Sequence, residues 1–269
     1  MDILVCVKRV PTVGGKITLT EDGQEVDTRM SGFTVSPHEE CAVEEAVQLT
    51  ERLGGTVSVL TLGAEIAIEQ LRDALALGAG RAVLLDTGGN RPPGPPRETG
   101  GNRPPGPPRE TGGREYGPIA TAAAIAAEVR AHGYDLVLLG NEASDTGDYQ
   151  VGIRVAHELG WPVATGIKNL AVTDGVVVAR REYRGVEEAY TLPLPAVVTV
   201  KEGINLPRYP SLPGRLRAKR AQIERVPVPW RADGLRKQKL RVPDSVKHQA
   251  EVLGSVPDLV RVLDEMGVL

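Results

Sequence analysis

The residues whose types and spacing favour chemistry lie between Asp135 and Gly152, in the sequence DLVLLGNEASDTGDYQVG. An apolar run typical of a strand ends at Gly140, a polar turn of small residues follows, and Gln150 then leads into a helix-like period. In a parallel α/β sheet, a junction of this kind places a helix N-terminus and free backbone N–H groups against a ligand phosphate. The segment therefore predicts a nucleotide site, although many strand–turn–helix junctions bind no ligand.

The other reactive side chains form no catalytic or metal-binding pattern. Cys6 and Cys41 have neither a CxxC nor a zinc-type spacing, and the four histidines are dispersed along the chain. No Ser/His/Asp set or carboxylate pair has a useful spacing, so we predict no metal site and no acid–base or nucleophilic catalysis. The sequence also has no haem motif, iron–sulfur cysteines or redox dithiol, so any electron it handles must be carried by a bound cofactor.

The composition is typical of a globular protein with an aliphatic core. Of the 269 residues, 41% are hydrophobic but only 3% are aromatic, and the formal net charge is −3. No stretch approaches the roughly 20 apolar residues of a membrane span. At the N-terminus the apolar run precedes Lys8 and Arg9, the reverse of the order in a signal peptide. We therefore expect a first strand there, no integral membrane segment, and a cytoplasmic protein.

Strand-like runs alternate with helix-like periods over most of the chain. Ser36, Pro37 and Glu39 match a capping box that begins a helix, and Gly54 and Gly78 are helix-stop signals. The expected strands are 3–7, 56–60, 82–85 and 135–139, and the expected helices are 36–53, 64–77, 119–130 and 151–159. This alternation predicts an α/β fold with a doubly wound, mainly parallel sheet.

Two regions depart from this pattern. The sequence TGGNRPPGPPRE occurs twice, over 87–98 and 99–110, without an apolar face on which a structural repeat could stack. We expect a disordered, proline-rich surface insertion at 87–110, and an SH3-type ligand is the weaker alternative. The rest divides into an α/β domain at 1–226 and a C-terminal arm at 227–269, which either packs on its own domain or wraps a partner.

Residues 201–241 are strongly basic. A solvated face would explain this charge, and nucleic-acid binding is the functional alternative. Few aromatic side chains interleave with the basic ones, and repeated prolines argue against a continuous recognition helix, so we predict no nucleic-acid binding. A protein–protein docking strip fits better, because clustered charge steers association.

Five segments, in this order along the chain, carry a family resemblance: VCVKRVP, SPHEECAVEEAVQL, ALALGAGRAVLL, DLVLLGNEASDTGDYQVG and LPLPAVVTVKEGINLPRYPSLPGRLRAK. Together they span about residues 3–224 and resemble the beta subunit of electron transfer flavoprotein. The resemblance implies a Rossmann-like, adenine-nucleotide-binding fold and an alpha-subunit partner with which an FAD is shared. It further implies electron transfer from dehydrogenases to a quinone-linked or other acceptor, with an AMP or a second FAD held in this subunit.

The resemblance also assigns nucleotide-binding residues. Asp145, Gln150 and Gly152 match the family's nucleotide loop, in which backbone N–H groups and the helix dipole would receive phosphate. Cys6 matches a position that lines the adenosine pocket, and a packed thiol explains it equally well. Further members of the set are Gly140, which allows a close turn after the strand, and Gly63, which either borders the pocket or only begins the next helix.

A second group of matching residues concerns partners. Leu212, in RYPSLPG with Tyr209 and Pro213, matches the leucine that the family inserts into a hydrophobic pocket of a dehydrogenase. A leucine folded back onto the protein is the alternative. Glu182 matches a glutamate near the alpha subunit and its flavin, or is an ordinary surface carboxylate. Tyr209, Leu212 and Pro213 lie in the expected partner-recognition loop at 201–222, and Glu182 is a separate expected contact.

The loop departs from the family pattern in ways that leave the nucleotide open. Members that hold AMP have a DDDxNQTG-like loop, whereas this chain has DTGDYQVG, with Tyr149 and Val151 in place of side chains that could bind phosphate. The QVG ending is closer to bifurcating relatives with two FAD groups. The ring of Tyr149 either stacks on a purine or flavin or lies on the surface. A stand-alone, universal-stress-type nucleotide-binding module is the alternative function, although the chain has no late glycine-rich phosphate loop.

Overall fold

The computed structural model describes residues 1–12, 14, 17–88, 116–229, 231, 238–243 and 252–268. These residues divide into two units, one of 1–15 with 28–236 and one of 16–27 with 237–269. The first unit extends past the boundary expected at 226, and the second includes an N-terminal segment that the sequence did not associate with the arm. The repeat at 87–110 lies outside the described residues except for Thr87 and Gly88.

The first unit is built on a sheet of seven strands in the order β12-β5-β4-β1-β6-β11-β7. Every neighbouring pair is parallel. The strands are β1 (Asp2–Cys6), β4 (Thr56–Gly63), β5 (Arg81–Asp86), β6 (Leu136–Gly140), β7 (Val163–Ile167), β11 (Ala196–Val200) and β12 (Glu224–Pro227). Central strands such as β1 and β11 are mainly aliphatic because both of their faces are buried.

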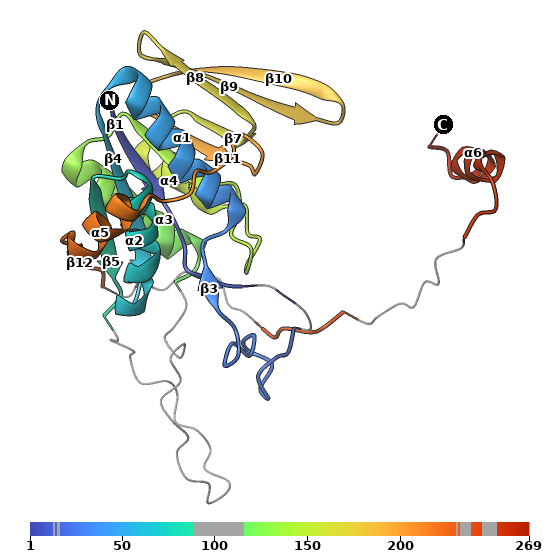
Figure 1. Cartoon of the computed structure of the whole chain (residues 1–269), viewed down its shortest axis with the longest axis horizontal. Helices are drawn as coiled ribbons and strands as arrows, with labels where there is room; N and C mark the ends of the chain where they lie inside the picture. Colours follow the sequence, from blue (N-terminus) through green and yellow to red (C-terminus); the bar gives the residue numbers. More distant parts are fainter. Residues whose placement is uncertain are drawn as a thin grey trace, which may run out of the picture. The chain divides into compact units, whose positions relative to one another are not determined.

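Helices cover both faces of this sheet (Figure 1). On one face, α1 (Pro37–Leu53), α2 (Ile68–Leu77) and α5 (Leu212–Arg220) contribute to one cluster of buried aliphatic side chains. On the other, α3 (Pro118–His132) and α4 (Val151–Leu159) contribute to a second. The expected doubly wound α/β fold is therefore confirmed.

Local signals explain where the helices begin and end. The N–H of Ser36 donates to the Glu39 carboxylate over 3.3 Å, and Pro37 occupies the first turn of α1. Gly54 and Gly78 follow α1 and α2, and both have positive φ angles, 75° and 138°. A short 3₁₀ turn, η1 (Glu65–Ala67), replaces the first residues of the helix expected at 64–77.

A separate antiparallel sheet was not expected from the sequence. It has the order β10-β9-β8 and consists of β8 (Asn169–Thr173), β9 (Val176–Tyr183) and β10 (Val186–Pro193). Its two turns have consecutive positive φ angles at Asp174–Gly175 and at Arg184–Gly185. Asp-Gly between alternating residues is a strong hairpin signal, so this sheet could have been found from the sequence. It forms a three-stranded ribbon within the first unit, beside the seven-stranded sheet (Figure 1).

Smaller elements complete the two units. In the first, β2 (Val10–Pro11) pairs with β3 (Phe33–Thr34), and the Arg9 guanidinium lies 3.3 Å from the centre of the Phe33 ring. In the second, the N–H of Leu240 donates to the carbonyl of Gly23 over 2.8 Å, and α6 (Val256–Glu265) has a capping Ser255. Among the described residues, no helix combines the length and apolarity needed to cross a bilayer.

Candidate nucleotide site

The candidate site lies at the point where the order of the parallel strands reverses. From the central β1 the chain continues to β4 on one side, and it later returns to β6 on the other. In open α/β sheets, the crevice outside the carboxyl ends of two such strands is the usual place for a ligand. The carboxyl ends here are Cys6, which is paired in register with Leu139, and Gly140 at the end of β6.

An ion pair connects the segments that follow these two strands. The Nζ atom of Lys8, just after β1, lies 2.8 Å from the carboxylate of Asp145, in the loop after β6. The N-terminus of α1 joins them, because the Ser36 hydroxyl accepts the N–H of Ser144 over 3.0 Å. The predicted nucleotide loop is therefore attached both to β1 and to α1, and Asp145 lies in the site with a cationic partner.

Glu39 is the buried acid of this site. The residue is 6% exposed, and its carboxylate accepts the backbone N–H of Lys8 over 3.1 Å as well as that of Ser36. Burial raises the pKa of Glu39 to about 8, although the two N–H donors and the Lys8 cation oppose this rise. The sequence identifies Glu39 only as a helix-capping residue, and no feature of the sequence indicates that the fold encloses it beside Lys8.

Two of the predicted glycines are required by close packing. A Cβ atom at Gly140 would lie 2.7 Å from Cγ of Glu39, so the end of β6 lies directly against the first turn of α1. A Cβ atom at Gly152 would lie 2.3 Å from Cγ2 of Thr199, in the first turn of α4 against β11. Both glycines therefore bring a helix N-terminus close to the carboxyl end of a strand.

The first turn of α4 has free backbone donors of the kind that bind phosphate in other proteins. Helix geometry leaves the N–H groups of Val151, Gly152 and Ile153 unused by the helix itself. The Gln150 side chain is oriented by Arg154, whose Nη2 donates to Gln150 Oε1 over 2.8 Å. The side chains of the first turn are therefore held by a contact within α4.

Cys6, Gly63 and Tyr149 lie at or near the same sheet edge with different surroundings. Cys6 is 7% exposed, and burial raises the pKa of its thiol far above the usual range, so it is a neutral group. Gly63 ends β4, and its carbonyl accepts the N–H of Thr87 over 3.1 Å. Tyr149 has a φ of 55° and is 54% exposed, and its hydrogen bond with Glu142 raises its pKa. The ring of Tyr149 is therefore held at the surface of the loop.

The predicted partner residues lie elsewhere. Tyr209 and Leu212 are 94% and 71% exposed, so Leu212 is not folded back onto the protein. Leu212 and Pro213 are the first residues of α5, which Ser211 caps by accepting the N–H of Gly214 over 3.1 Å. Part of the segment expected as a loop at 201–222 is thus helical, because proline is favoured in a first turn. Glu182 lies exposed on β9, in the antiparallel sheet.

The described residues contain no group of three or more His, Cys, Asp or Glu side chains arranged to hold a metal ion. The donors at the switch point fit a nucleotide instead: helix N–H groups for phosphate, the hydroxyls of Ser36 and Ser144, and one cation, Lys8. These observations define the chain as an α/β protein with a doubly wound, mainly parallel sheet and a candidate nucleotide site at its switch point.

Comparison with known proteins identifies the family. A model described as "Electron transfer flavoprotein domain" matches residues 26–92 and 112–230. The beta subunit from Bacillus subtilis is 33% identical over 224 residues, covering 83% of this chain and 78% of its own length. The human beta subunit is 34% identical over 82% of this chain and 79% of its own length, and the mitochondrial beta subunit of japonica rice is 33% identical over 100% of both chains. The chain belongs to the electron transfer flavoprotein family, as a subunit of the beta type.

Proposed function

We propose that the chain is the nucleotide-holding subunit of a heterodimeric electron carrier. In this proposal it binds one AMP or one FAD at the β1/β6 switch point and encloses, with an alpha subunit, a shared FAD. The heterodimer passes electrons from dehydrogenases to a quinone-linked or other acceptor, and we expect it in the cytoplasm. The family match favours this function over the stand-alone stress-type module.

The observation that carries the proposal is the Lys8–Asp145 ion pair beside the N-terminus of α4. It joins the carboxyl ends of the two strands at the switch point, where nucleotides bind in folds of this class. The N–H groups of the first turn of α4 would bind a phosphate, while Lys8 and the mainly neutral Glu39 keep the local negative charge low.

The chain's own part in electron transfer would be to bind and to position. The redox chemistry is supplied by the flavin when it is bound, because the described side chains include no redox dithiol or metal cluster. Gly140 and Gly152 let the N-termini of α1 and α4 approach the strand ends, and the buried, neutral Cys6 thiol would lie beside the nucleotide without taking part in proton transfer. Leu212 and Tyr209 would contact dehydrogenases, and Glu182 would contact the alpha subunit.

The nucleotide itself remains the point to test. The chain is copurified with its alpha subunit, the heterodimer is denatured, and the released FAD and AMP are quantified per heterodimer. About one FAD and one AMP would define a simple carrier, whereas about two FAD and no AMP would define the bifurcating type that accepts a hydride from NADH. A heterodimer that releases neither nucleotide would contradict the proposal.

A matched pair of variants locates the nucleotide. Lys8→Gln removes the cation that holds Asp145, and it should lower the nucleotide content by a measurable fraction because the loop loses its attachment to β1. Lys219→Gln serves as the control of the same chemistry, since Lys219 is exposed on α5 and makes no contact with the candidate site. Equal nucleotide content in both variants would argue against the switch point as the site.

A further inference from the structure

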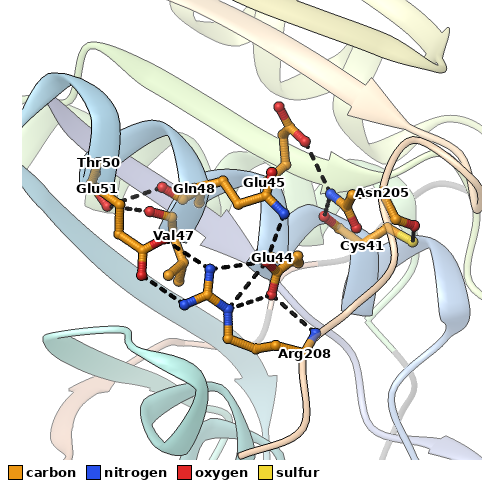
Figure 2. A network of polar contacts seen from close by, with 10 residues as sticks. Cys41, Glu44, Glu45, Val47, Gln48, Thr50, Glu51, Asn205 and Arg208 are labelled. Carbon is orange, nitrogen blue, oxygen red and sulfur yellow. Dashed lines mark hydrogen bonds and ion pairs between the residues drawn. The ribbon is translucent and has the colours of Figure 1, made fainter.

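The segment that joins β11 to α5 has no regular secondary structure between Lys201 and Ser211, yet it is attached to α1 by side chains. Figure 2 shows these contacts, with Arg208 and Asn205 reaching the acidic side chains of α1. The attachment lies directly before Tyr209 and close to Leu212, the residues proposed to meet a dehydrogenase.

Arg208 forms the centre of the attachment. Its Nε and Nη2 atoms donate to Glu44 over 2.9 and 3.0 Å, and its Nη1 and Nη2 atoms donate to Glu51 over 2.6 and 2.9 Å. The backbone N–H of Arg208 also donates to Glu44 over 3.2 Å. Glu44 and Glu51 are two turns apart on α1 and so face the same way, and together they bind the planar guanidinium along two edges.

The acceptor for Arg208 is itself preorganised. Glu44 is 2% exposed, and the Gln48 side chain donates to its Oε1 over 2.7 Å. Asn205 provides a second attachment, because its Nδ2 donates to the Cys41 carbonyl and to Glu45 Oε2, each over 3.0 Å. The segment is therefore fixed to one face of α1 at two positions.

The apolar side chains next to these attachments point away from the protein. Leu206 and Tyr209 are 89% and 94% exposed, and Leu212 is 71% exposed. Burial of their own side chains cannot hold Leu206 and Tyr209 in place, so the polar contacts to α1 hold this stretch and with it the approach of the chain to Leu212 at the start of α5. A contact surface that is ordered before its partner arrives loses less conformational entropy on binding.

We propose that Arg208 is a positioning residue, whose attachment to Glu44 and Glu51 holds Tyr209 and Leu212 in a single binding-ready arrangement. This inference rests on the proposed docking of Leu212 into a dehydrogenase. An ion pair that only stabilised the fold would change unfolding without changing the local order of this segment or its coupling to Leu212.

The test uses the full-length chain in its heterodimer and compares Arg208→Gln, Arg208→Lys and Glu51→Gln. Lysine keeps the charge but cannot bind two carboxylates along two edges, so Arg208→Lys should behave like Arg208→Gln. In Glu51→Gln, Arg208 keeps its contact with the buried Glu44. This variant therefore weakens the attachment even if the Arg208 variants fail to fold. The matched control is Arg225→Gln, because Arg225 forms a similar two-edged pair with Glu65 over 2.6 and 3.1 Å on a different part of the surface.

Two quantities are measured. Hydrogen exchange of the Arg208 amide, which donates to Glu44, should accelerate roughly tenfold in both Arg208 variants, less in Glu51→Gln, and not in Arg225→Gln. One dehydrogenase is first captured with the wild-type heterodimer, identified and purified. The dissociation constant of its complex with each heterodimer variant is then measured. It should rise roughly five- to thirtyfold for Arg208→Gln, and the double variant Arg208→Gln/Leu212→Ala should bind about as weakly as Leu212→Ala alone because the two residues act together.

The possible failures are distinguishable. If Leu212→Ala leaves the dissociation constant unchanged, the docking role is wrong, and the positioning role falls with it. If Leu212→Ala weakens binding while Arg208→Gln does not, or if their effects multiply independently, only the positioning role is overturned. Unchanged amide exchange in both Arg208 variants would overturn it as well.

Discussion

At the scale of single residues, the candidate site depends on close approaches that a glycine or a buried acid makes possible. Gly140 and Gly152 allow two helix N-termini to lie against strand ends, and Glu39 is enclosed where β1 ends. The predicted importance of both glycines came from a loop pattern, whereas the structure shows a packing reason for each. Their substitution should therefore affect stability as well as nucleotide binding.

Gly152→Ala should destabilise the protein by roughly 1–3 kcal/mol, because the added methyl group would overlap Thr199 and push α4 away from β11. Urea unfolding of the variant measures this change in the free energy of unfolding. Gly80→Ala is the control, since a Cβ atom there would lie at an ordinary 3.8 Å from the Val57 carbonyl. Equal stability of the two variants would contradict the packing role of Gly152.

Glu39→Gln should change how stability depends on pH. The pKa of Glu39 is about 8 in the folded protein against an ordinary 4.5, so between these values the folded protein keeps a proton that the unfolded chain loses. The contribution of Glu39 to the free energy of unfolding is therefore complete below the lower value and is lost as pH rises through about 8.

The wild-type protein should lose stability relative to Glu39→Gln by on the order of a few kcal/mol between about pH 5 and about pH 8.5. Urea unfolding across this range, with Glu182→Gln as an exposed control, makes the measurement. Parallel pH profiles for wild type and Glu39→Gln would show that the buried carboxyl is not protonated in the folded state.

At the scale of elements, α5 combines an apolar first turn with a basic exposed surface. Leu212 begins the helix, Gly214 and Ala218 are buried, and Arg72 donates to the carbonyls of Ala218 and Lys219 at its C-terminal end. A Cβ atom at Gly214 would lie 2.5 Å from the carbonyl of Ala76, so α5 packs closely on the end of α2. The helix is therefore a fixed platform for the side chains that it exposes.

Leu212→Ala should weaken binding of a dehydrogenase to the heterodimer by roughly 2–4 kcal/mol, mainly by faster dissociation, because an anchor side chain is removed. Leu206→Ala is the matched control, since Leu206 is also exposed and lies on the same segment. Surface plasmon resonance measures both variants. The folding and flavin content of Leu212→Ala should stay unchanged, and equal affinities of the two variants would exclude a specific anchor.

The basic face of α5 should control how fast partners associate. Its exposed cations are Arg215, Arg217, Lys219 and Arg220. Exposed charges act over about 10 Å at 0.1 M salt, so the association rate should fall as salt rises while the dissociation rate changes little. Arg217→Gln should flatten this salt dependence, whereas Arg225→Gln on β12 should not. An association rate that does not depend on salt would show that the basic face of α5 does not steer association.

At the scale of the whole molecule, the described parts form a sheet-bearing unit and a second unit with an amphipathic helix. None of the residues of α6 is buried, and its apolar side chains follow a helical stripe formed by Val256, Leu259, Val260 and Leu263. An exposed stripe of this kind is typical of a surface that packs against another chain or domain. The arm therefore remains a proposed contact for the alpha subunit.

A chain that ends at Arg236 should fold but should fail to copurify with the alpha subunit, because the apolar stripe of α6 is absent. Circular dichroism and thermal unfolding measure the fold, and pull-down of a tagged alpha subunit measures assembly. In the full-length chain, Leu259→Asp should reproduce the loss of assembly, while Arg261→Gln on the polar face should not. Full assembly of the shortened chain with a lowered melting temperature would indicate that the arm packs on its own domain.

The sequence by itself determined the features whose causes are local. The capping residues before α1, the glycines after α1 and α2, and the alternation of aliphatic strands with helices act within a few residues, so they predicted the parallel α/β fold. The antiparallel sheet could also have been predicted, from the hairpin signal of its Asp174–Gly175 turn, but it was not among the predicted elements. The segment after β6 was recognised as a candidate site for the same local reason.

Only the tertiary structure decided which distant residues meet. Lys8 contacts Asp145 across 137 positions, and Arg208 contacts Glu44 across 164 positions. These contacts depend on the order of the strands and on which face each helix covers. No periodic pattern in the sequence predicts the strand order or the face that a helix covers. Burial of Glu39 has the same origin, because its enclosure requires β1, β6 and the first turn of α1 to converge.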